Sequence, residues 1–226
     1  MVINTINPHS FYVADHDEAF KHALKRSSVL LPDGVGIVYA NFFLNKVPIR
    51  RIPGYEIFIY VMQMLERSTE SRVKRVFFLG STPEVLATIE GRIKTDFPSL
   101  QVGVYSPPFK QAFSDADDEA IASAVNEFNP HVLFVGMTAP KQEKWVAQNH
   151  RRINAPMICS IGAVFDFYAR KVVRPGSIWQ SLGLEWFRRL INEPKRLWRR
   201  TFVSLPYFLR KVLSLGVKRA LPQAKT

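Results

Sequence analysis

An acid stands beside two glycines in the segment Leu31-Pro32-Asp33-Gly34-Val35-Gly36, between a short apolar run and a stretch with helical spacing. The segment is similar to the start of a dinucleotide-binding fingerprint, but Tyr39 stands where the third glycine would be and the turn contains an acid. We therefore do not expect an NAD site. Asp33 could cap the following helix or act as a general base facing a ligand crevice, and the residue types leave both interpretations open.

Three other turns contain residues that suit a phosphate or a nucleotide. The apolar run before Gly80 ends in small residues, whose backbone N–H groups can approach a phosphate at a helix start. Gly136 is followed by Gln142 and Glu143, which we expect in a first helical turn, either as ligand-binding groups or as ordinary helix-start residues. Asp166 stands among apolar neighbours, where an unpaired charge is costly, so it needs a partner such as a ligand hydroxyl or a base edge.

Other charged segments suggest anion or metal binding. Arg50-Arg51-Ile52-Pro53-Gly54 could hold an anionic group near the next helix, or form a solvated loop. Asp15-His16-Asp17 and Asp115-Ala116-Asp117-Asp118 contain the Asp-x-Asp pattern that many sugar transferases use for a metal. Each stands at a predicted helix start with no strand directly before it, so we interpret both as capping residues. The five histidines show no metal-ligand spacing, and we expect neither a metal nor another cofactor.

Asp33 and the turns at Gly80, Gly136 and Asp166 follow segments that the hydrophobic pattern predicts as strands. Apolar runs rich in β-branched residues predict strands near Val2–Thr5, Val29–Leu31, Arg75–Leu79, Val102–Tyr105, Val132–Val135 and Met157–Ile161. Helical spacing predicts helices at Asp17–Arg26, Ile37–Leu44, Tyr55–Ser68, Pro83–Phe97, Asp117–Phe128 and Lys141–Asn149. This alternation predicts an α/β fold with a Rossmann-like parallel sheet and crossover helices. Ligands bind at the carboxyl ends of such strands, where Asp33 and these three turns are expected to lie.

The last quarter of the chain differs in composition from the rest. From Arg170 to Thr226 there are 14 Lys and Arg residues and two acids, whereas the preceding residues carry no net charge. Trp, Leu, Phe and Arg alternate irregularly after Pro175-Gly176, which predicts two or three amphipathic helices. We predict an α/β domain over residues 1–177 and a helical appendage over residues 178–226. The appendage either lies on an anionic membrane surface or packs on the body as a basic helix.

Length and composition set further bounds. A chain of 226 residues with 47% hydrophobic residues can form a substantial core, which excludes disorder throughout. Its single cysteine, Cys159, cannot form an internal disulfide, which favours a reducing compartment. The N-terminus lacks a signal-peptide pattern, and no uncharged apolar stretch reaches the about 18–20 residues of a membrane span. We therefore expect a protein on the cytoplasmic side that does not cross a bilayer, and the basic, tryptophan-containing tail predicts that it binds peripherally to the inner face of the plasma membrane.

Several short motifs, taken in order, resemble the WecG/TagA/CpsF family of bacterial glycosyltransferases, glycosyltransferase family 26. The resemblance runs from about residue 2 to about residue 202. The motifs that carry it are Thr5-Ile6-Asn7, Leu31-Pro32-Asp33-Gly34-Val35-Gly36, Arg51-Ile52-Pro53-Gly54, Phe78-Leu79-Gly80, Ser106-Pro107-Pro108-Phe109, Gly136 with Pro140-Lys141-Gln142-Glu143, Gly162-Ala163 with Phe165-Asp166, and Leu182 to Leu190 continuing to Glu193-Pro194 and Arg196.

This resemblance implies an inverting, metal-independent transferase that moves a sugar from a UDP-sugar to an undecaprenyl-diphosphate-linked saccharide. It also implies that the α/β domain over residues 1–177 is the catalytic, UDP-sugar-binding part. Family members act in the biosynthesis of enterobacterial common antigen, wall teichoic acid and exopolysaccharide. By resemblance, Asp33 is the general base. The donor site comprises Thr5, Asn7, Arg51, Gln142, Tyr105 and Asp166, to which the turns described above add Gly80, Gly136 and Glu143. The resemblance assigns the lipid-linked acceptor at the membrane to Arg189, Arg196 and Arg199.

Two alternatives stay open on the sequence. One is a Rossmann-like binding module whose basic tail contacts nucleic acid, and the other is a nucleotide-sugar enzyme without a lipid acceptor. Trp and Leu interleaved with Arg suit lipid better, and no standard nucleic-acid motif is present, so we expect no nucleic-acid partner. The donor sugar, the acceptor glycan, the role of residues after about 201 and the oligomeric state, including a homo-oligomer, are not determined by the sequence.

Overall fold

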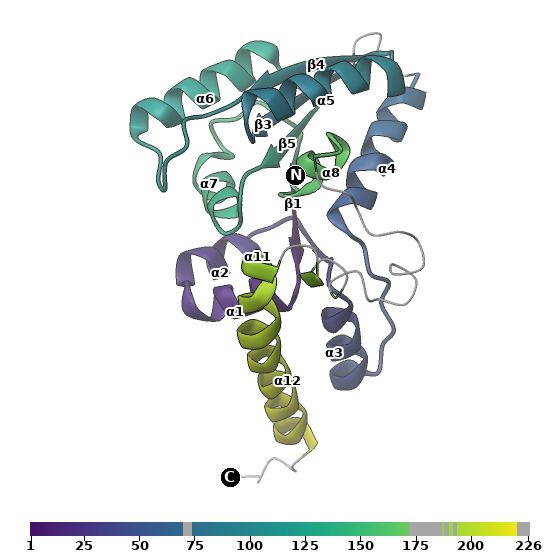
Figure 1. The fold of residues 1–226 in the computed structure, drawn as a ribbon, viewed down its shortest axis with the longest axis vertical. Helices are drawn as coiled ribbons and strands as arrows, with labels where there is room; N and C mark the ends of the chain where they lie inside the picture. The colour runs from purple at the N-terminus through teal and green to yellow at the C-terminus, as the bar shows by residue number, and fades with distance from the viewer. Residues whose placement is uncertain (70–73, 172–186, 188–189, 192–193, 221–226) are drawn as a thin grey trace. The chain divides into compact units, whose positions relative to one another are not determined.

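A computed structural model describes residues 1–69, 74–171, 187, 190–191 and 194–220 of the chain. Six strands form one sheet in the order β2-β1-β6-β5-β3-β4, and every pairing from β1 through to β4 is parallel (Figure 1). The strands are β1 Val2–Ile6, β2 Val29–Pro32, β3 Lys74–Gly80, β4 Leu100–Tyr105, β5 Val132–Gly136 and β6 Met157–Ser160. The predicted fold class and all six predicted strands are confirmed.

Helices alternate with these strands along the chain. They are α1 Pro8–His16, α2 Glu18–Lys25, α3 Val35–Asn45, α4 Gly54–Arg67, α5 Pro83–Asp96, α6 Asp115–Phe128, α7 Lys141–Asn149, α8 Val164–Tyr168, α11 Pro194–Arg199, the π-helix η1 Arg200–Ser204, and α12 Leu205–Ala220. The six predicted helices are confirmed, and their ends differ from the prediction by two residues or fewer. The pattern did not predict α1 and α8.

The helix α1 was not predicted. Its N-terminus has ordinary signals, because the Asn7 side chain accepts from the backbone N–H groups of His9 and Ser10 and Pro8 occupies the first turn. The Asp15-His16-Asp17 segment joins two helices: Asp15 and His16 lie in the last turn of α1, Asp17 is its C-cap, and α2 begins at the next residue, close to the predicted helix start. A short helix with few buried residues leaves too little apolar periodicity to reveal it.

The chain forms two compact units, each assembled from separate segments. Unit 1 contains Met1–Thr5, Ala19–Leu31 and Pro53–Val173, and unit 2 contains Ile6–Glu18, Pro32–Ile52 and Arg174–Thr226. The predicted boundary between residues 177 and 178 lies outside the described residues. The C-terminal helices therefore share a compact unit with α1 and α3 from the first quarter of the chain.

The core of unit 1 covers both faces of the sheet. On one face, Phe78 of β3 packs against Phe58 of α4 and Phe165 of α8, with ring centroids 6.1 and 5.3 Å away. On the other, Phe77 and Leu79 join a cluster that includes residues of α6 and α7. Strands buried on both faces are apolar at successive positions, which is why β3 and β5 read as continuous apolar runs.

Unit 2 is held together by contacts between its early and late segments. Phe208 of α12 is 2% exposed and packs edge-on against Phe11 of α1, with ring centroids 5.2 Å apart. A Cβ added to Gly216 of α12 would lie only 2.5 Å from the ring of Phe43 on α3, so glycine allows these two helices to approach closely. Arg219 donates to the Leu44 carbonyl at the end of α3 at 3.1 Å.

In the described residues, no helix is both long and apolar enough to cross a membrane.

Candidate functional site

In unit 1, the predicted donor residues Gly80, Tyr105 and Gly136 lie at the carboxyl ends of three neighbouring strands. Gly80 pairs in register with Gly136, and Leu79 pairs with Tyr105. Gly80 has φ +109°, and a Cβ there would lie 2.8 Å from the Gly136 carbonyl oxygen. A side chain at Gly80 would be strained and would collide with backbone, so glycine keeps the β3 and β5 ends close together. The sheet topology brings these three predicted residues together at one edge.

Gly136 also determines where α8 packs. A Cβ at Gly136 would lie 2.4 Å from the Phe165 ring, so only glycine allows this phenylalanine to lie over the end of β5. The next residue, Asp166, lies in the first turn of α8 and is half-buried. The short helix α8 therefore holds Asp166 near the carboxyl end of β5. The apolar residues around Asp166 in the sequence did not predict this placement.

Gln142 and Glu143 form a buried polar pair in the first turn of α7. Each is 4% exposed, and Gln142 Nε2 donates to Glu143 Oε1 at 2.8 Å. Within the described residues, Gln142 Oε1 and Glu143 Oε2 have no hydrogen-bond partner. Burial raises the pKa of Glu143 to about 7, because an ionised carboxylate loses its hydration there. A buried polar pair whose oxygens lack hydrogen-bond partners is costly to the fold and is typical of a functional site.

Two further buried polar residues were missed by the sequence reasoning. Asn4 of β1 and Ser160 of β6 are each 1% exposed, and Asn4 Oδ1 and Ser160 Oγ have no hydrogen-bond partner in the described part of the chain. Asn4 Nδ2 donates to Ser27 Oγ at 2.8 Å, which orients its amide. A polar residue inside an apolar strand run is the available signal for both.

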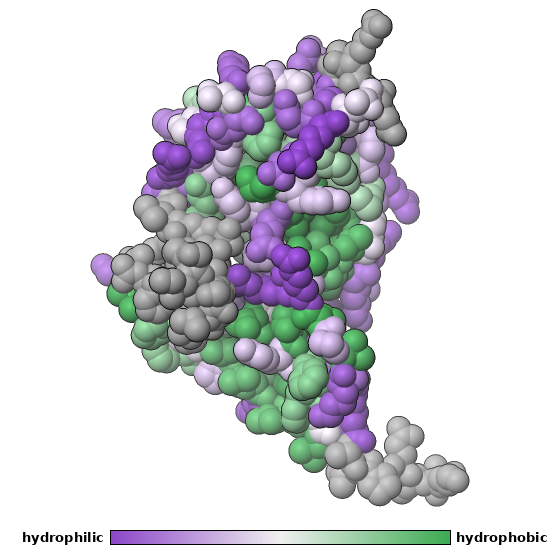
Figure 2. All heavy atoms as spheres, turned by 90° about the vertical axis from the view of Figure 1, so that its right-hand side faces the viewer, coloured by the Kyte–Doolittle hydropathy of each residue, from purple (hydrophilic) through white to green (hydrophobic). Residues whose placement is uncertain are grey.

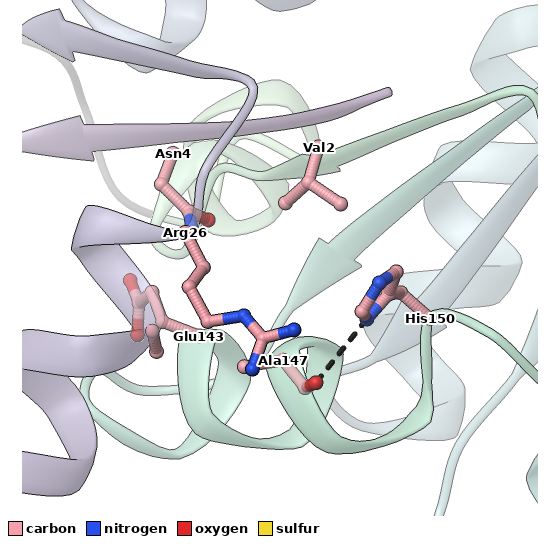
Figure 3. Close-up of a pocket in the computed structure, with 7 residues that line it drawn as sticks. Val2, Asn4, Arg26, Glu143, Ala147 and His150 are labelled. Atoms are coloured by element: carbon pink, nitrogen blue, oxygen red, sulfur yellow. Dashed lines mark hydrogen bonds between the residues drawn. The ribbon is translucent and has the colours of Figure 1, made fainter.

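Asn4 and Glu143 line a small cavity between β1, α2 and α7 (Figure 3). The cavity has a volume of about 100 Å³, and its lining residues are Val2, Asn4, Ala23, Arg26, Glu143, Ala147 and His150. Figure 3 shows the Arg26 side chain extending over α7, with Glu143 and His150 on opposite sides of it. This volume suits a few water molecules, so polar groups here can be hydrated without being open to bulk solvent.

In unit 2, the ends of β1 and β2 bring Asp33, Asn7 and the segment after Arg51 together. The Asp33 N–H donates to the Ile6 carbonyl at 3.0 Å, and the Ile52 N–H donates to the Pro32 carbonyl at 2.8 Å. A Cβ at Gly34 would lie 3.0 Å from Asn7 Cβ, so glycine permits this close approach. Asp33 and Arg51 are both half-buried. The backbone thus places a carboxylate and a guanidinium-bearing residue on adjoining segments.

The structure places Asp33 one residue before the N-cap of α3. That N-cap is Gly34, which has no side chain to cap the helix. Asp33 is therefore not the N-cap residue, and its role as the general base stays a prediction. Asn7, by contrast, uses its Oδ1 to cap α1, while Thr5 occupies the last position but one of β1.

The acidic segments that match the Asp-x-Asp pattern have local structural partners. Asp117 accepts from Ser114 and from Lys110 Nζ at 2.8 Å, and these hydrogen bonds lower the pKa of Asp117 to about 2. Asp118 accepts from Trp145 Nε1 at 2.7 Å, and Asp15 accepts from Lys211 Nζ at 2.9 Å. Ser114 caps α6, which agrees with the capping interpretation of that segment. The described residues contain no group of three acids, histidines or cysteines arranged to hold a metal.

The three arginines predicted to bind the acceptor are described to different extents. Arg189 lies outside the described residues, and the side chain of Arg196 does too, although its backbone lies in α11. Arg199 is exposed at the end of α11, with its guanidinium 5.5 Å from the centre of the Trp198 ring.

A parallel sheet with helices on both faces defines a Rossmann-like α/β protein, a fold in which ligands generally bind at the carboxyl ends of the strands. Comparison with known proteins identifies the particular class. A model of the glycosyl transferase WecG/TagA/CpsF family matches residues 1–221, and the chain belongs to this family.

Relatives share most of their length with this chain. An N-acetylglucosaminyldiphosphoundecaprenol N-acetyl-beta-D-mannosaminyltransferase of Bacillus subtilis (strain 168) is 30% identical over 212 residues, which cover 94% of this chain and 78% of the relative. The enzyme of the same name from Staphylococcus aureus (strain MW2) is 27% identical over 225 residues, covering 100% of this chain and 84% of the relative. The chain is therefore a glycosyltransferase, and the alternative of a binding module without enzyme activity is set aside.

Proposed function

We propose that this enzyme transfers a sugar from a UDP-sugar to an undecaprenyl-diphosphate-linked saccharide, with inversion and without a metal, in bacterial cell-surface polysaccharide biosynthesis. The observation that carries the proposal is the half-buried Asp33, which follows β2, is not a helix cap, and adjoins the Arg51 segment. The names of the relatives support the acceptor class, because both describe transfer to a diphosphoundecaprenol-linked sugar.

The proposed chemistry needs one base and one way to stabilise the leaving group. The carboxylate of Asp33 accepts the proton of an acceptor hydroxyl as that oxygen attacks the anomeric carbon of the donor. The C–O bond to UDP breaks on the opposite face, and the configuration inverts. UDP leaves as an anion, whose charge Arg51 and backbone N–H groups at helix starts stabilise. No second carboxylate is needed as a nucleophile, because the sugar is not held covalently.

The donor roles divide between strand ends and helix starts. We assign uridine binding to Tyr105 and Asp166, and the remaining donor contacts to Thr5, Asn7, Arg51, Gly80, Gly136 and Gln142. Gly80 and Gly136 support this role through backbone that no side chain obstructs, at the edge where parallel sheets bind ligands. Gln142 supports it through a buried oxygen that has no partner among the described residues. Such an atom gains a full hydrogen bond when a ligand reaches it.

We assign the acceptor diphosphate to Arg189, Arg196 and Arg199, because guanidinium groups bind phosphate oxygens in pairs. The membrane contact is assigned to apolar residues exposed on α3, η1 and α12, here called the apolar surface. Its members are exposed by 40% or more: Tyr39, Phe42, Phe43, Phe202, Val203, Leu209, Leu213, Leu215 and Val217. The part of Figure 2 over α3 shows apolar side chains gathered there. Of the cations on α12, Lys211 pairs with Asp15 and Arg219 donates to the end of α3, whereas Arg210 and Lys218 are exposed. We assign contacts with anionic headgroups to Arg210 and Lys218.

Donor binding is tested first with the full-length protein in EDTA. We expect UDP-sugars to raise the melting temperature, whereas ADP- and GDP-sugars should not. Gln142→Ala and Asp166→Ala should each weaken UDP-sugar affinity by about 1–3 kcal/mol, because each removes a hydrogen bond from a desolvated ligand group. Isothermal titration measures the affinities.

Glu127→Gln, an exposed change on α6, is the control for these variants and should leave affinity unchanged. Unchanged UDP-sugar affinity in both binding-site variants would place the nucleotide elsewhere. Turnover that is lost in EDTA and restored specifically by magnesium or manganese would contradict the metal-independent mechanism.

Membrane binding is tested with a matched pair of exposed tyrosines. Tyr39 of the apolar surface is 69% exposed, and Tyr60 of α4 is 68% exposed. Tyr39→Ser should weaken binding to vesicles of anionic phospholipid about fivefold, because it removes roughly 1 kcal/mol of apolar burial in the bilayer. Tyr60→Ser should bind as the unaltered enzyme does, and co-sedimentation measures both.

Combining Tyr39→Ser with Leu213→Ser on α12 should weaken vesicle binding further if both helices enter the interface. Equal binding by the double variant and the Tyr60→Ser control would exclude α3 and α12 as the membrane contact.

A further inference from the structure

The Gln142 amide has a defined polarity because of its neighbour. An ionised carboxylate only accepts hydrogen bonds, so the amide nitrogen of Gln142 must face Glu143, as the 2.8 Å contact between Nε2 and Oε1 shows. The amide oxygen then points away from Glu143 and has no partner among the described residues. A Cβ added to Gly162 would lie 3.6 Å from Gln142 Nε2 and 3.7 Å from Oε1. The Gln142 amide, including its unpaired oxygen, therefore lies beside the turn that follows β6, at the edge where ligands bind in this fold.

We propose that Glu143 is a positioning residue that orients the Gln142 amide, so that Gln142 presents an acceptor to a hydroxyl or N–H group of the bound UDP-sugar. This inference rests on the proposed function, because it takes Gln142 to contact the donor. It assigns Glu143 a role through Gln142 in place of the direct donor contact expected from the sequence. It also specifies the polarity of the ligand group, which must be a hydrogen-bond donor.

Both residues are buried enough for this orientation to be maintained. Gln142 and Glu143 are each 4% exposed, so water cannot readily replace either partner. Without an acceptor beside Nε2, the amide could rotate and present an N–H group to the ligand. The N–H group of the rotated amide would then face an N–H or hydroxyl donor of the ligand. Two donors cannot form a hydrogen bond with each other, so the contact with the ligand would be lost. The carboxylate thus excludes the wrong orientation by its inability to donate.

Glu143 also faces the small cavity, where other charges can act on it. The other charged or titratable groups in the lining are Arg26, which directly follows α2, and His150, the C-cap of α7, whereas β1 contributes the uncharged Val2 and Asn4 (Figure 3). His150 makes a 3.2 Å contact from Nδ1 to the Ala147 carbonyl within α7. Any pH effect assigned to Glu143 must therefore be separated from the titration of His150.

The pair predicts how donor binding depends on pH. Burial raises the pKa of Glu143 to about 7, so the carboxylate is ionised above this pH and protonated below it. A protonated Glu143 can donate to Gln142 Oε1, and that hydrogen bond favours the rotated amide. Donor affinity should therefore be highest above about pH 8 and fall as the pH decreases through 7.

The test measures UDP-sugar affinity of the full-length enzyme between about pH 6 and about pH 8.5 by isothermal titration. For the unaltered enzyme, Kd should rise about tenfold toward the acidic end of this range. The reason is that protonation of Glu143 lowers the fraction of enzyme molecules in which the Gln142 amide is correctly oriented. Glu143→Gln should give a pH-independent Kd close to that of the unaltered enzyme at the acidic end. Glu143→Asp, which keeps an acid, should retain a pH-dependent step.

Gln142→Ala provides a readout that a purely structural role of Glu143 would not affect. Its weaker Kd should be independent of pH, and adding Glu143→Gln to it should change affinity no further. The change of Kd with pH can be judged by comparing Gln142→Ala with the unaltered enzyme. The outcome therefore does not depend on whether Glu143→Gln folds. His150→Asn should leave the step in place, and so should the exposed Glu127→Gln.

The possible outcomes separate this inference from the function it rests on. If no UDP-sugar binds the unaltered enzyme, the proposed function fails and this inference fails with it. If UDP-sugar binds with the same Kd across the pH range, or if the step persists in Gln142→Ala, the positioning role alone is overturned. If His150→Asn removes the step, the titrating group is His150, and the inference is likewise overturned.

Discussion

Asp33→Asn should lower the rate of sugar transfer by about 10²–10⁴-fold, because an amide cannot accept the proton that the acceptor hydroxyl must lose. UDP-sugar affinity should change by less than about threefold, since a base acts mainly in the transition state. The substitution keeps the shape of the side chain. It also leaves intact the backbone hydrogen bond from Asp33 to Ile6 and the cap of α3 at Gly34. Single-turnover transfer and isothermal titration measure the two quantities separately.

The exposed acid Asp115, in the first turn of α6, is a matched control for this change. Asp115→Asn should transfer sugar at the unaltered rate. Full activity of Asp33→Asn would exclude Asp33 as the base. A fall in melting temperature together with a parallel loss of UDP-sugar affinity would instead indicate that Asp33 maintains the local fold.

Phe208→Ala should lower the free energy of unfolding by about 3–5 kcal/mol, which is the usual cost of removing a buried aromatic side chain. Phe208 is 2% exposed, contacts Phe11 of α1 edge-on, and lies 3.6 Å from the position of a Cβ at Gly36 in α3. The substitution leaves a cavity where α12 meets helices from the first quarter of the chain. Urea unfolding followed by circular dichroism measures the loss.

The neighbouring residue Leu209 is 49% exposed on the same helix and provides the control. Leu209→Ala should cost less than about 1 kcal/mol, because the exposed part of a side chain contributes little to folding. Equal losses in the two variants would show that α12 does not pack on α1 and α3.

This packing affects the design of truncation experiments. Removing residues 178–226 would delete Phe208, Leu197 and Val212, which are all buried, and expose apolar surface of unit 2. Asp33 belongs to that unit. A truncated chain should therefore lose stability whether or not it binds a membrane, so the exposed-residue variants of α3 and α12 test the proposed membrane contact more directly.

Local pattern alone determined most of the secondary structure. The strand β3 was predicted because its residues are apolar at successive positions, and burial on both faces of a parallel sheet produces that pattern. The start of α6 was predicted from Ser114 and the acids after it, which cap the helix and interact favourably with its dipole. Such signals depend on residues within one or two turns of each other, so a sequence contains them completely.

Short elements with mixed composition were not predictable in this way. The helix α8 has five residues, and its position depends on Phe165 packing over Gly136, which is distant in the sequence. The helix α1 has a clear cap at Asn7 but little apolar periodicity, and the same asparagine also matched a family motif. A cap and a ligand contact require the same residue type, so sequence could not separate these roles.

The arrangement of the candidate site depended on the tertiary structure. Sequence identified Gln142 and Glu143 as residues of a helix start, but their burial and the orientation of the amide follow from packing around α7. Asn4 and Ser160 became candidates only once the structure showed them buried with unpaired oxygens. Likewise, the C-terminal helices joined α1 and α3 in one unit through contacts such as Phe11 with Phe208. Burial and pairing arise between residues far apart in the chain, and local periodicity carries no information about which of those residues meet.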